Sequence, residues 1–238
     1  LSEGIVAITL NRPESLNALS PALFSELNQI VTELSKQTDS VGCVILRGAG
    51  RCFSAGNDLK AVRSGVKAKE KFFQAKTIDL VEKLPQPTIA SVHGHCLTGA
   101  LELAIACDLM ITSESANLAD THGKWGMVPG WGMSVRLPRR VGLLKAKEMM
   151  FTGMSINGLQ AVEIGLSSQC VADDHLKVST LDLAESIVKN SWHTNFADKK
   201  LFLDNENHFH DASLKMEREQ SATVASDMHE RVKQGFKS

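Results

Sequence analysis

The hydrophobic positions along the chain predict an alternation of strands and helices. Short apolar runs rich in β-branched residues mark four predicted strands, at residues 4–10, 41–46, 87–92 and 107–112. Residues 23–34 instead carry apolar side chains at helical spacing, and Ser20-Pro21 before them provides an N-cap and a first-turn proline. This alternation favours an α/β fold with mainly parallel strands and right-handed crossovers.

The stretch from residue 93 to residue 107 combines a strand end, a glycine turn and an apolar helix. Gly94 to Gly99 predicts the turn, and residues 100–107 predict a helix buried on every side, because Glu102 is its only charge. A carboxylate in a dry interior is unfavourable unless it is paired or hydrogen-bonded, and such a group often has a function. The alternative is that Glu102 lies in the first turn, near N3, because the helix dipole favours an acid there. The two interpretations are compatible.

The turn before this helix has the features of an anion-binding site. Glycine at position 99 lets another molecule's oxygen approach the backbone closely, and a helix N-terminus offers N–H groups with partial positive charge. The turn and Glu102 together predict a place where an anion is stabilised beside a base.

Composition places the chain among ordinary globular proteins. It has 238 residues, of which 43% are hydrophobic and 22% charged, and a net charge of -1, so nothing in its overall charge favours nucleic acid or an anionic membrane. No apolar run approaches the roughly 20 residues that span a bilayer. The five cysteines, an odd number, suggest free thiols in a reducing compartment. We expect a cytoplasmic protein, or one of the mitochondrial matrix if a targeting segment precedes Leu1.

Two further segments could bind a ligand. Lys60, Arg63, Lys67 and Lys71 recur at spacings of three and four, which would align them on one face of a helix. Such a row usually forms a solvated face, but it could also clamp the phosphates of a nucleotide-bearing ligand. Residues 123–132 are rich in glycine and contain two tryptophans, which predicts a tight loop shaped around something flat or close-packed.

Four motifs then identify a family. They are Leu10-Asn-Arg-Pro13 with Asn17-Ala-Leu19, Phe53-Ser-Ala-Gly-Asn-Asp-Leu59, Gly99-Ala-Leu-Glu-Leu-Ala104 with Cys107-Asp108, and Gly126-Met-Val-Pro129 with Gly132. Each is weak alone, but four in order and in register are specific. Along nearly its whole length the chain resembles the crotonase superfamily, the enoyl-CoA hydratases and isomerases.

This resemblance implies an architecture. The fold would be a crotonase-like spiral of ββα repeats in residues 1–190, which holds the active site, followed by a C-terminal helical region in residues 191–238. In the family that region builds homotrimers, often paired into hexamers. The partners implied are an acyl-CoA substrate and other copies of the chain, without nucleic acid or a membrane.

The resemblance also implies site residues. The backbone N–H groups of Ala55 and Gly99 would form an oxyanion hole for a thioester enolate. No separate cofactor and no metal is expected, since coenzyme A enters as part of the substrate. The residues expected to contact the substrate or its CoA portion are Ser15, Leu16, Ala55, Gly56, Asn57, Asp58, Leu59, Lys60 and Gly99.

The catalytic pair departs from the hydratase pattern at one position. Glu102 matches the family's water-activating glutamate, but His122 stands where hydratases carry the glutamate that supplies the α-proton; Asp120 is the nearest carboxylate, two residues out of register. A histidine donates and accepts protons near neutral pH, so Glu102 and His122 form a workable pair for adding water to an enoyl-CoA. We therefore expect a hydratase-like lyase. The alternative is another crotonase-type reaction: isomerisation, decarboxylation, dehalogenation or thioester hydrolysis.

Other kinds of site have weaker support. His93 and His95, with Cys96 adjacent, lack a third and fourth ligand for a metal, and Cys52 has no evident base and is better explained as a buried thiol. An RNA-binding protein that uses the row beginning at Lys60 is a hypothesis of another class, although the balanced net charge argues against it. A catalytically silent oligomeric scaffold is a further alternative.

Overall fold

A parallel sheet forms the centre of the molecule. The computed structural model describes residues 3–64, 70–220 and 233. Its five-stranded sheet has the order β1-β2-β3-β5-β8, and all its pairings are parallel. The strands are β1 (Ile5–Leu10), β2 (Cys43–Gly48), β3 (Thr88–Val92), β5 (Leu109–Ser113) and β8 (Gln169–Val171). The four predicted strands are confirmed, while β8 was too short to give a periodic signal.

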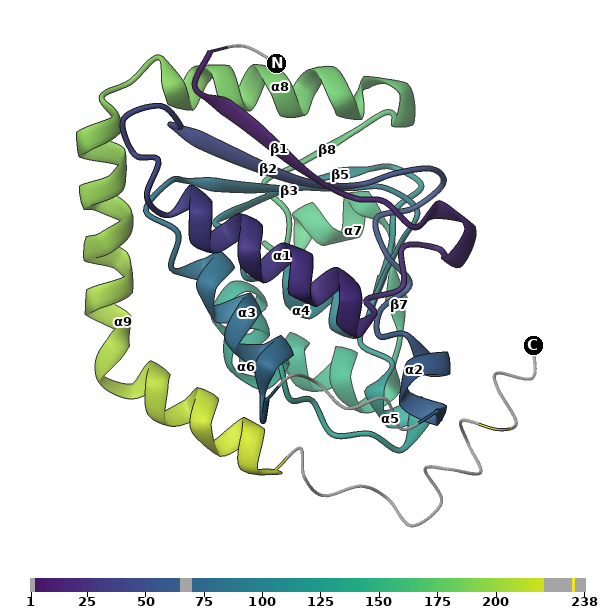
Figure 1. Ribbon diagram of the computed structural model, residues 1–238. Helices are drawn as coiled ribbons and strands as arrows, with labels where there is room; N and C mark the ends of the chain where they lie inside the picture. Colours follow the sequence, from purple (N-terminus) through teal and green to yellow (C-terminus); the bar gives the residue numbers. More distant parts are fainter. Residues whose placement is uncertain (1–2, 65–69, 221–232, 234–238) are drawn as a thin grey trace.

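Helices cover both faces of this sheet (Figure 1). On one side, α1 (Pro21–Leu34) and α3 (Phe73–Glu82) pack together, and Ser20 caps α1 as predicted, its Oγ accepting from Leu23 N at 3.2 Å. On the other side lies α8 (Leu176–Val188). Successive strand residues alternate between the two cores: Val44 and Leu46 face the larger one, Cys43 and Ile45 the one under α8.

A smaller sheet lies beside the glycine turn. It has the order β4-β6-β7, formed by β4 (His95–Leu97), β6 (Asn117–Ala119) and β7 (Ser155–Ile156), with β6 and β7 antiparallel. We predicted only a turn over residues 94–99, and the strand inside it was missed. Helix α4 (Gly99–Ala104) follows directly, and all six of its residues are buried as predicted, although the helix ends at Ala104 rather than at Cys107.

The next helices continue the fold from α4. After α5 (His122–Trp125), α6 (Met133–Thr152) contains a break at Gly142, where φ is 76° and ψ is 155°. Residues 133–141 thus form its first part and residues 143–152 its second. Helix α7 (Gly158–Glu163) begins with a capping box formed by Asn157 and Gln160. Helix α2 (Leu59–Arg63) and two single 3-10 turns, η1 (Pro13–Ser15) and η2 (Asp173–His175), complete the described elements that precede the last helix.

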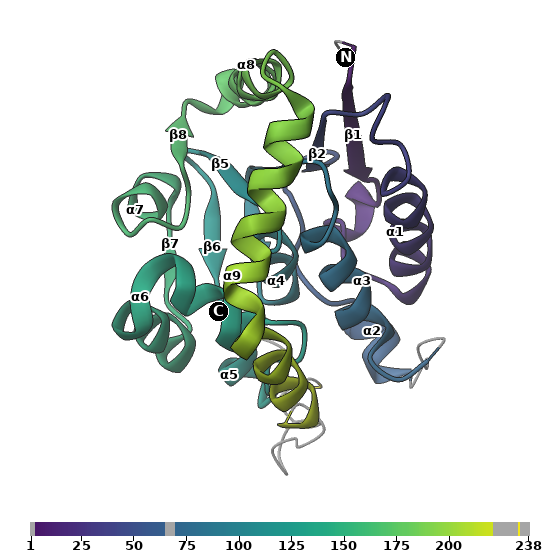
Figure 2. The ribbon, with the colours of Figure 1, turned by 90° about the vertical axis from the view of Figure 1, so that its left-hand side faces the viewer.

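The last described element is the long helix α9 (Trp192–Gln220), which runs from α8 past α6 (Figure 2). Lys199 ties it to the core, because its Nζ donates to Asp108 Oδ2 at 2.7 Å and to Gln86 O at 3.1 Å. Arg218 pairs with Asp79 of α3. The region from residue 191 is therefore helical as expected, as far as it is described. No helix in the described ranges is long and apolar enough to cross a membrane.

Candidate active site

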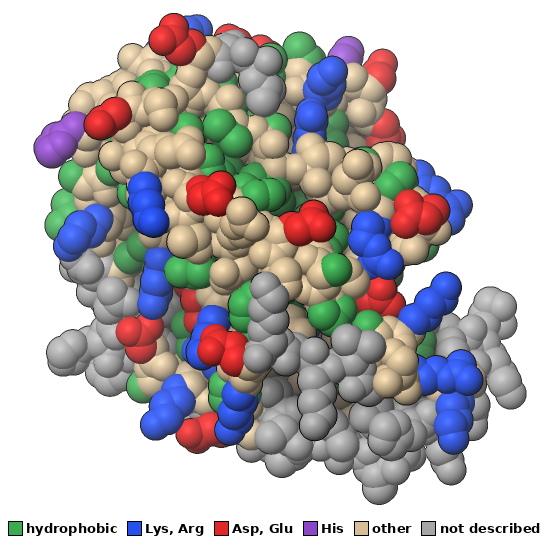
Figure 3. Space-filling view, in the orientation of Figure 1, with side chains coloured by type: hydrophobic (Ala, Val, Ile, Leu, Met, Phe, Trp, Pro, Cys, Tyr) green, Lys and Arg blue, Asp and Glu red, His purple; other side chains and the backbone are tan. Residues whose placement is uncertain are grey.

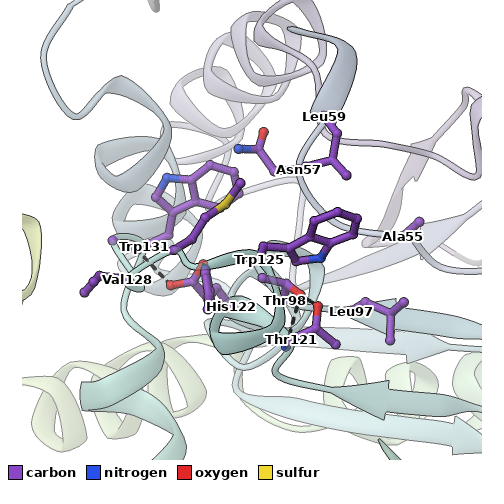
Figure 4. Close-up of a pocket in the computed structure, with 14 residues that line it drawn as sticks. Ala55, Asn57, Leu59, Leu97, Thr98, Thr121, His122, Trp125, Val128 and Trp131 are labelled. Carbon is purple, nitrogen blue, oxygen red and sulfur yellow. Dashed lines mark hydrogen bonds and ion pairs between the residues drawn. The ribbon is translucent and has the colours of Figure 1, made fainter. Parts of the chain in front are cut away.

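A cavity of about 430 Å³ opens between the glycine turn and the tryptophan-containing loop (Figure 4). His122, Trp125 and Trp131 project into the same space, and Asn57 and Leu59 approach it from the opposite side. Residues 123–125 of the predicted tight loop are helical instead, and residues 125–131 supply much of the cavity wall. The lining residues are Ala55, Asn57, Leu59, Leu97, Thr98, Gly99, Glu102, Thr121, His122, Trp125, Met127, Val128, Gly130 and Trp131.

Glu102 is held in one orientation by backbone donors. It lies in the first turn of α4 and is only 1% exposed, yet it lines the cavity. Its Oε1 accepts the N–H of Trp131 at 2.8 Å and that of Met133 at 3.2 Å. These bonds satisfy one carboxylate oxygen and direct the side chain toward the cavity.

His122 faces Glu102 across a short gap. It begins α5, is 8% exposed, and its Nε2 lies 3.7 Å from Glu102 Oε2. Its Nδ1 lies 2.6 Å from Asp120 Oδ1. The two predicted catalytic side chains therefore come together at the cavity although they lie on different helices.

The backbone segments that contain Ala55 and Gly99 run side by side. Ser54 N donates to His95 O at 2.9 Å, and Leu97 N donates to Ser54 O at 3.3 Å. Between them Gly56 has φ +96°, and a Cβ there would lie 2.5 Å from Leu97 O. Only glycine allows this close approach.

The N–H group of Ala55 points away from the cavity. It donates to Leu16 O at 2.9 Å, so in this structure it is not available to a substrate oxygen. Two positions further on, Asn57 lies opposite Leu19 in an isolated parallel β-bridge. The two hydrogen bonds of this bridge are made by the residues on either side of Asn57: Leu19 N donates to Gly56 O, and Asp58 N donates to Leu19 O. Among the described residues, no acceptor faces the N–H of Asn57 or that of Gly99. The unused donor on the first segment is thus Asn57 rather than Ala55.

Trp131 closes the cavity against Gly99. A Cβ on Gly99 would lie 2.4 Å from the indole ring, so the side chain of any other residue would collide with it. The indole also contacts Phe24 of α1 edge to face, with ring centroids 5.0 Å apart. Gly99 therefore needs to be glycine because of packing as well as ligand access.

Several of the expected substrate-contacting residues have structural partners. Asp58 caps α2 (Leu59–Arg63) by accepting from Lys60 N and Ala61 N, and pairs with Arg12 at 2.9 Å. Burial raises the pKa of Asp58, but the hydrogen bonds and charge of Arg12 outweigh it, so that pKa lies below its usual value. Of the remaining predicted contacts, Asn57 and Leu59 line the cavity, while Ser15, Leu16, Gly56 and Lys60 lie outside it.

The basic row does not lie on one helix. Helix α2 ends at Arg63, Lys67 lies outside the described residues, and Lys71 precedes α3 with its Nζ 4.7 Å from the Phe72 ring centroid. Lys and Arg side chains nevertheless gather over α2 on the face in Figure 3, whereas elsewhere on that face they alternate with Asp and Glu. The prediction that the four basic residues share one face of a single helix was wrong, because helix α2 ends at Arg63.

The structure does not favour the metal site or the cysteine nucleophile considered as alternatives. His93 Nε2 lies 2.9 Å from Gly50 O, and His95 Nδ1 lies 3.5 Å from Asn117 Nδ2. No group of three potential metal ligands occurs in the described part of the chain. Burial raises the pKa of the Cys52 thiol, which disfavours the nucleophilic thiolate.

Sequence reasoning missed the role of Asp120 and of the small-sheet residues Leu97 and Thr98. The signal for Asp120 was its position two residues before His122 at the end of a short strand, within reach of the imidazole. Leu97 and Thr98 gave no signal, because they were assigned to a turn rather than to a strand and a helix cap.

Comparison with known proteins places this geometry in a family. The model of the Enoyl-CoA hydratase/isomerase family matches residues 1–238. A probable peroxisomal enoyl-CoA hydratase of Arabidopsis thaliana is 35% identical over 189 residues, covering 79% of this chain and 71% of its own. A putative enoyl-CoA hydratase/isomerase of Bacillus subtilis is 39% identical over 196 residues, covering 79% and 74%.

A solved structure agrees. The crystal structure of an enoyl-CoA hydratase/isomerase from Xanthobacter autotrophicus superposes with a TM-score of 0.87 at 31% identity, covering 96% of this chain and 89% of the other. The predicted crotonase fold is confirmed. This chain belongs to the enoyl-CoA hydratase/isomerase family, the crotonase superfamily.

Proposed function

We propose that the protein adds water across the 2,3 double bond of an enoyl-CoA thioester. The observation that carries this proposal is the 3.7 Å separation of Glu102 Oε2 and His122 Nε2 at a cavity lined by Asn57 and Gly99, whose N–H groups have no acceptor among the described residues. Two acid–base groups on one side and two N–H groups on the other are what an addition through an enolate requires.

The reaction follows from the positions of these groups. Glu102 takes a proton from water as the water oxygen bonds to C3, and the electron pair of the double bond moves onto the thioester oxygen. The N–H groups of Asn57 and Gly99 stabilise this oxyanion, and each such donor typically contributes about 3 to 4 kcal/mol. His122, in its cationic form with a proton on each ring nitrogen, then gives the Nε2 proton to C2, and the proton on Glu102 returns to Nε2 across the short gap, which restores the carboxylate and the cation.

The walls of the cavity suit an acyl chain. Leu59, Leu97, Trp125 and Trp131 supply apolar surface around the acid–base pair, which would exclude bulk water from the enolate. Lys60 and Arg63 are the basic side chains of α2, and they would bind the phosphates of CoA. We retain Ser15 and Leu16 as expected contacts of the CoA portion of the substrate.

Self-association remains part of the proposal. Large apolar side chains are exposed on α6 and α7, where Leu144 is 84%, Phe151 81% and Leu159 54% exposed. Apolar side chains exposed to this degree are consistent with contacts to other copies in a trimer or hexamer.

The test is the loss of conjugated absorbance when a trans-2-enoyl-CoA is mixed with the protein. Glu102→Gln should abolish the loss, while Glu163→Gln on the exposed side of α7 should leave it unchanged. A panel with 3-enoyl and malonyl-type CoA thioesters separates the alternatives: turnover of one of these without hydration of any 2-enoyl-CoA would replace the hydratase assignment by isomerase or decarboxylase activity.

A further inference from the structure

Asp120 and His122 form a buried hydrogen-bonded pair behind the cavity. Asp120 is 1% exposed and follows β6, while His122 opens α5 two residues later. Asp120 Oδ1 accepts the backbone N–H of His122 at 3.1 Å and lies 2.6 Å from His122 Nδ1. One carboxylate oxygen thus contacts both the main chain and the ring of the same residue.

This contact decides where the ring proton lies. An ionised carboxylate only accepts hydrogen bonds, so Nδ1 must be the donor. In the neutral ring the other nitrogen, Nε2, then carries the lone pair. When the ring takes up a proton, the proton goes to Nε2 while Nδ1–H stays on Asp120.

Nε2 is also the ring atom that lies next to Glu102. It lies 3.7 Å from Glu102 Oε2, and His122 lines the cavity. Glu102 is held from the other side through its Oε1 by Trp131 N. With Nδ1–H held by Asp120, Nε2 is therefore the nitrogen that can exchange a proton with Glu102 or with a molecule in the cavity.

We propose that Asp120 is a positioning residue that locks His122 in the Nδ1–H tautomer and so makes Nε2 the proton-transferring atom of the site. This inference rests on the proposed function for its kinetic consequence, but not for the tautomer itself. A carboxylate that orients a catalytic histidine in this way accounts for large rate factors. After His122 has given its Nε2 proton to C2, only a neutral ring with an unprotonated Nε2 can take a proton back from Glu102 at that atom.

A structural role for Asp120 makes a different prediction. By accepting from His122 N, Asp120 could serve only as a cap that shapes the start of α5. Serine also accepts a backbone N–H at such a position, but its hydroxyl is one bond shorter and does not reach the ring. Asparagine keeps an acceptor oxygen for both contacts. Asp120→Ser and Asp120→Asn therefore separate capping from control of the ring.

The experiment combines nitrogen NMR of the histidine ring with steady-state kinetics on the full chain. In protein labelled with ¹⁵N-histidine and assigned by comparison with His122→Ala, His122 should show a protonated Nδ1 in both the neutral and the cationic ring. In Asp120→Ser the neutral ring should contain the Nε2–H form. With an enoyl-CoA, kcat of Asp120→Ser should fall ~100-fold at similar KM, within the range of general acid–base effects, and Asp120→Asn should lose less.

Each outcome decides something. An Nε2–H ring in the unaltered protein, or an Asp120→Ser variant with unchanged kcat and unchanged tautomer, would overturn the inference. A circular dichroism spectrum and melting temperature that match the parent would show that a slow Asp120→Ser variant is folded. If no CoA thioester is turned over while the Nδ1–H tautomer is observed, the proposed reaction fails and the tautomer assignment stands.

Discussion

Arg136 and Glu102 both bind the backbone of Trp131, Arg136 at the carbonyl oxygen and Glu102 at the N–H group. Arg136 Nη1 donates to Trp131 O at 2.7 Å, and Trp131 N donates to Glu102 Oε1 at 2.8 Å. Arg136 itself is 3% exposed, with its guanidinium 2.8 Å from carboxylate oxygens of both Asp79 and Glu82 on α3. The wall of the cavity is thereby connected to an ion-pair cluster between α3 and α6.

Replacing Arg136 with methionine should destabilise the protein and slow it. Removing one partner from a buried ion pair typically costs about 3 to 5 kcal/mol, and Trp131 would lose the hydrogen bond to its carbonyl oxygen. Urea unfolding measures the first effect, and kcat with an enoyl-CoA measures the second. Arg139→Met, at an exposed position of the same helix, is the control, and equal unfolding free energies for the two variants would contradict the prediction.

The sequence predicted the fold best where the pattern was long and unambiguous. The four strands of the main sheet and α1, with its Ser20-Pro21 start, came from local propensity and capping. The strands of two or three residues, such as β4 and β7, were missed because their pairing depends on distant partners rather than on periodicity. The prediction of one continuous helix carrying the basic row from Lys60 was wrong, because α2 ends at Arg63 and Ser64 is its C-cap.

The candidate site shows the same division. Glu102 could be found because a lone charge in an apolar helix is conspicuous, and His122 because the motifs fix its register. The choice between Ala55 and Asn57 as donor could not be made from motifs, since it depends on which N–H is engaged by Leu16 O. The role of Asp120 likewise required a side-chain distance.

Gly56→Ala should lower kcat, and the loss should exceed the effect of placing alanine at a positive φ. The new Cβ would lie 2.5 Å from Leu97 O, so the two segments that carry Asn57 N–H and Gly99 N–H would be pushed apart. A displaced oxyanion donor costs on the order of 100-fold in kcat, which steady-state kinetics with an enoyl-CoA would detect.

Gly142→Ala is the matched control for Gly56→Ala. Gly142 also has positive φ, +76°, but a Cβ there would meet nothing within 4 Å. It should lose about 1 to 3 kcal/mol of unfolding free energy, because a positive φ with ψ at 155° is a conformation that essentially only glycine adopts, with kcat retained. Equal kcat values for the two variants would show that the spacing of the two segments does not matter.

The Arg12–Asp58 pair should stabilise the protein in a pH-dependent way. Burial raises the pKa of Asp58, and the hydrogen bonds and charge of Arg12 lower it further than burial raises it, so the folded-state pKa lies below 3.8. A carboxyl whose pKa is depressed by folding contributes stability above its unfolded pKa, and this contribution is lost as the pH falls through the folded pKa.

Asp58→Asn tests this dependence because asparagine can still cap α2 but carries no charge. The variant should unfold at lower urea concentration than the parent at pH 7, and the difference should shrink as the pH falls below about 4, toward the folded-state pKa. Urea titrations at a series of pH values measure the difference directly. Asp39→Asn, at an exposed position before β2, controls for the loss of one negative charge. A difference for Asp58→Asn that stays constant down to pH 3 would mean that the carboxylate charge of Asp58 does not stabilise the fold.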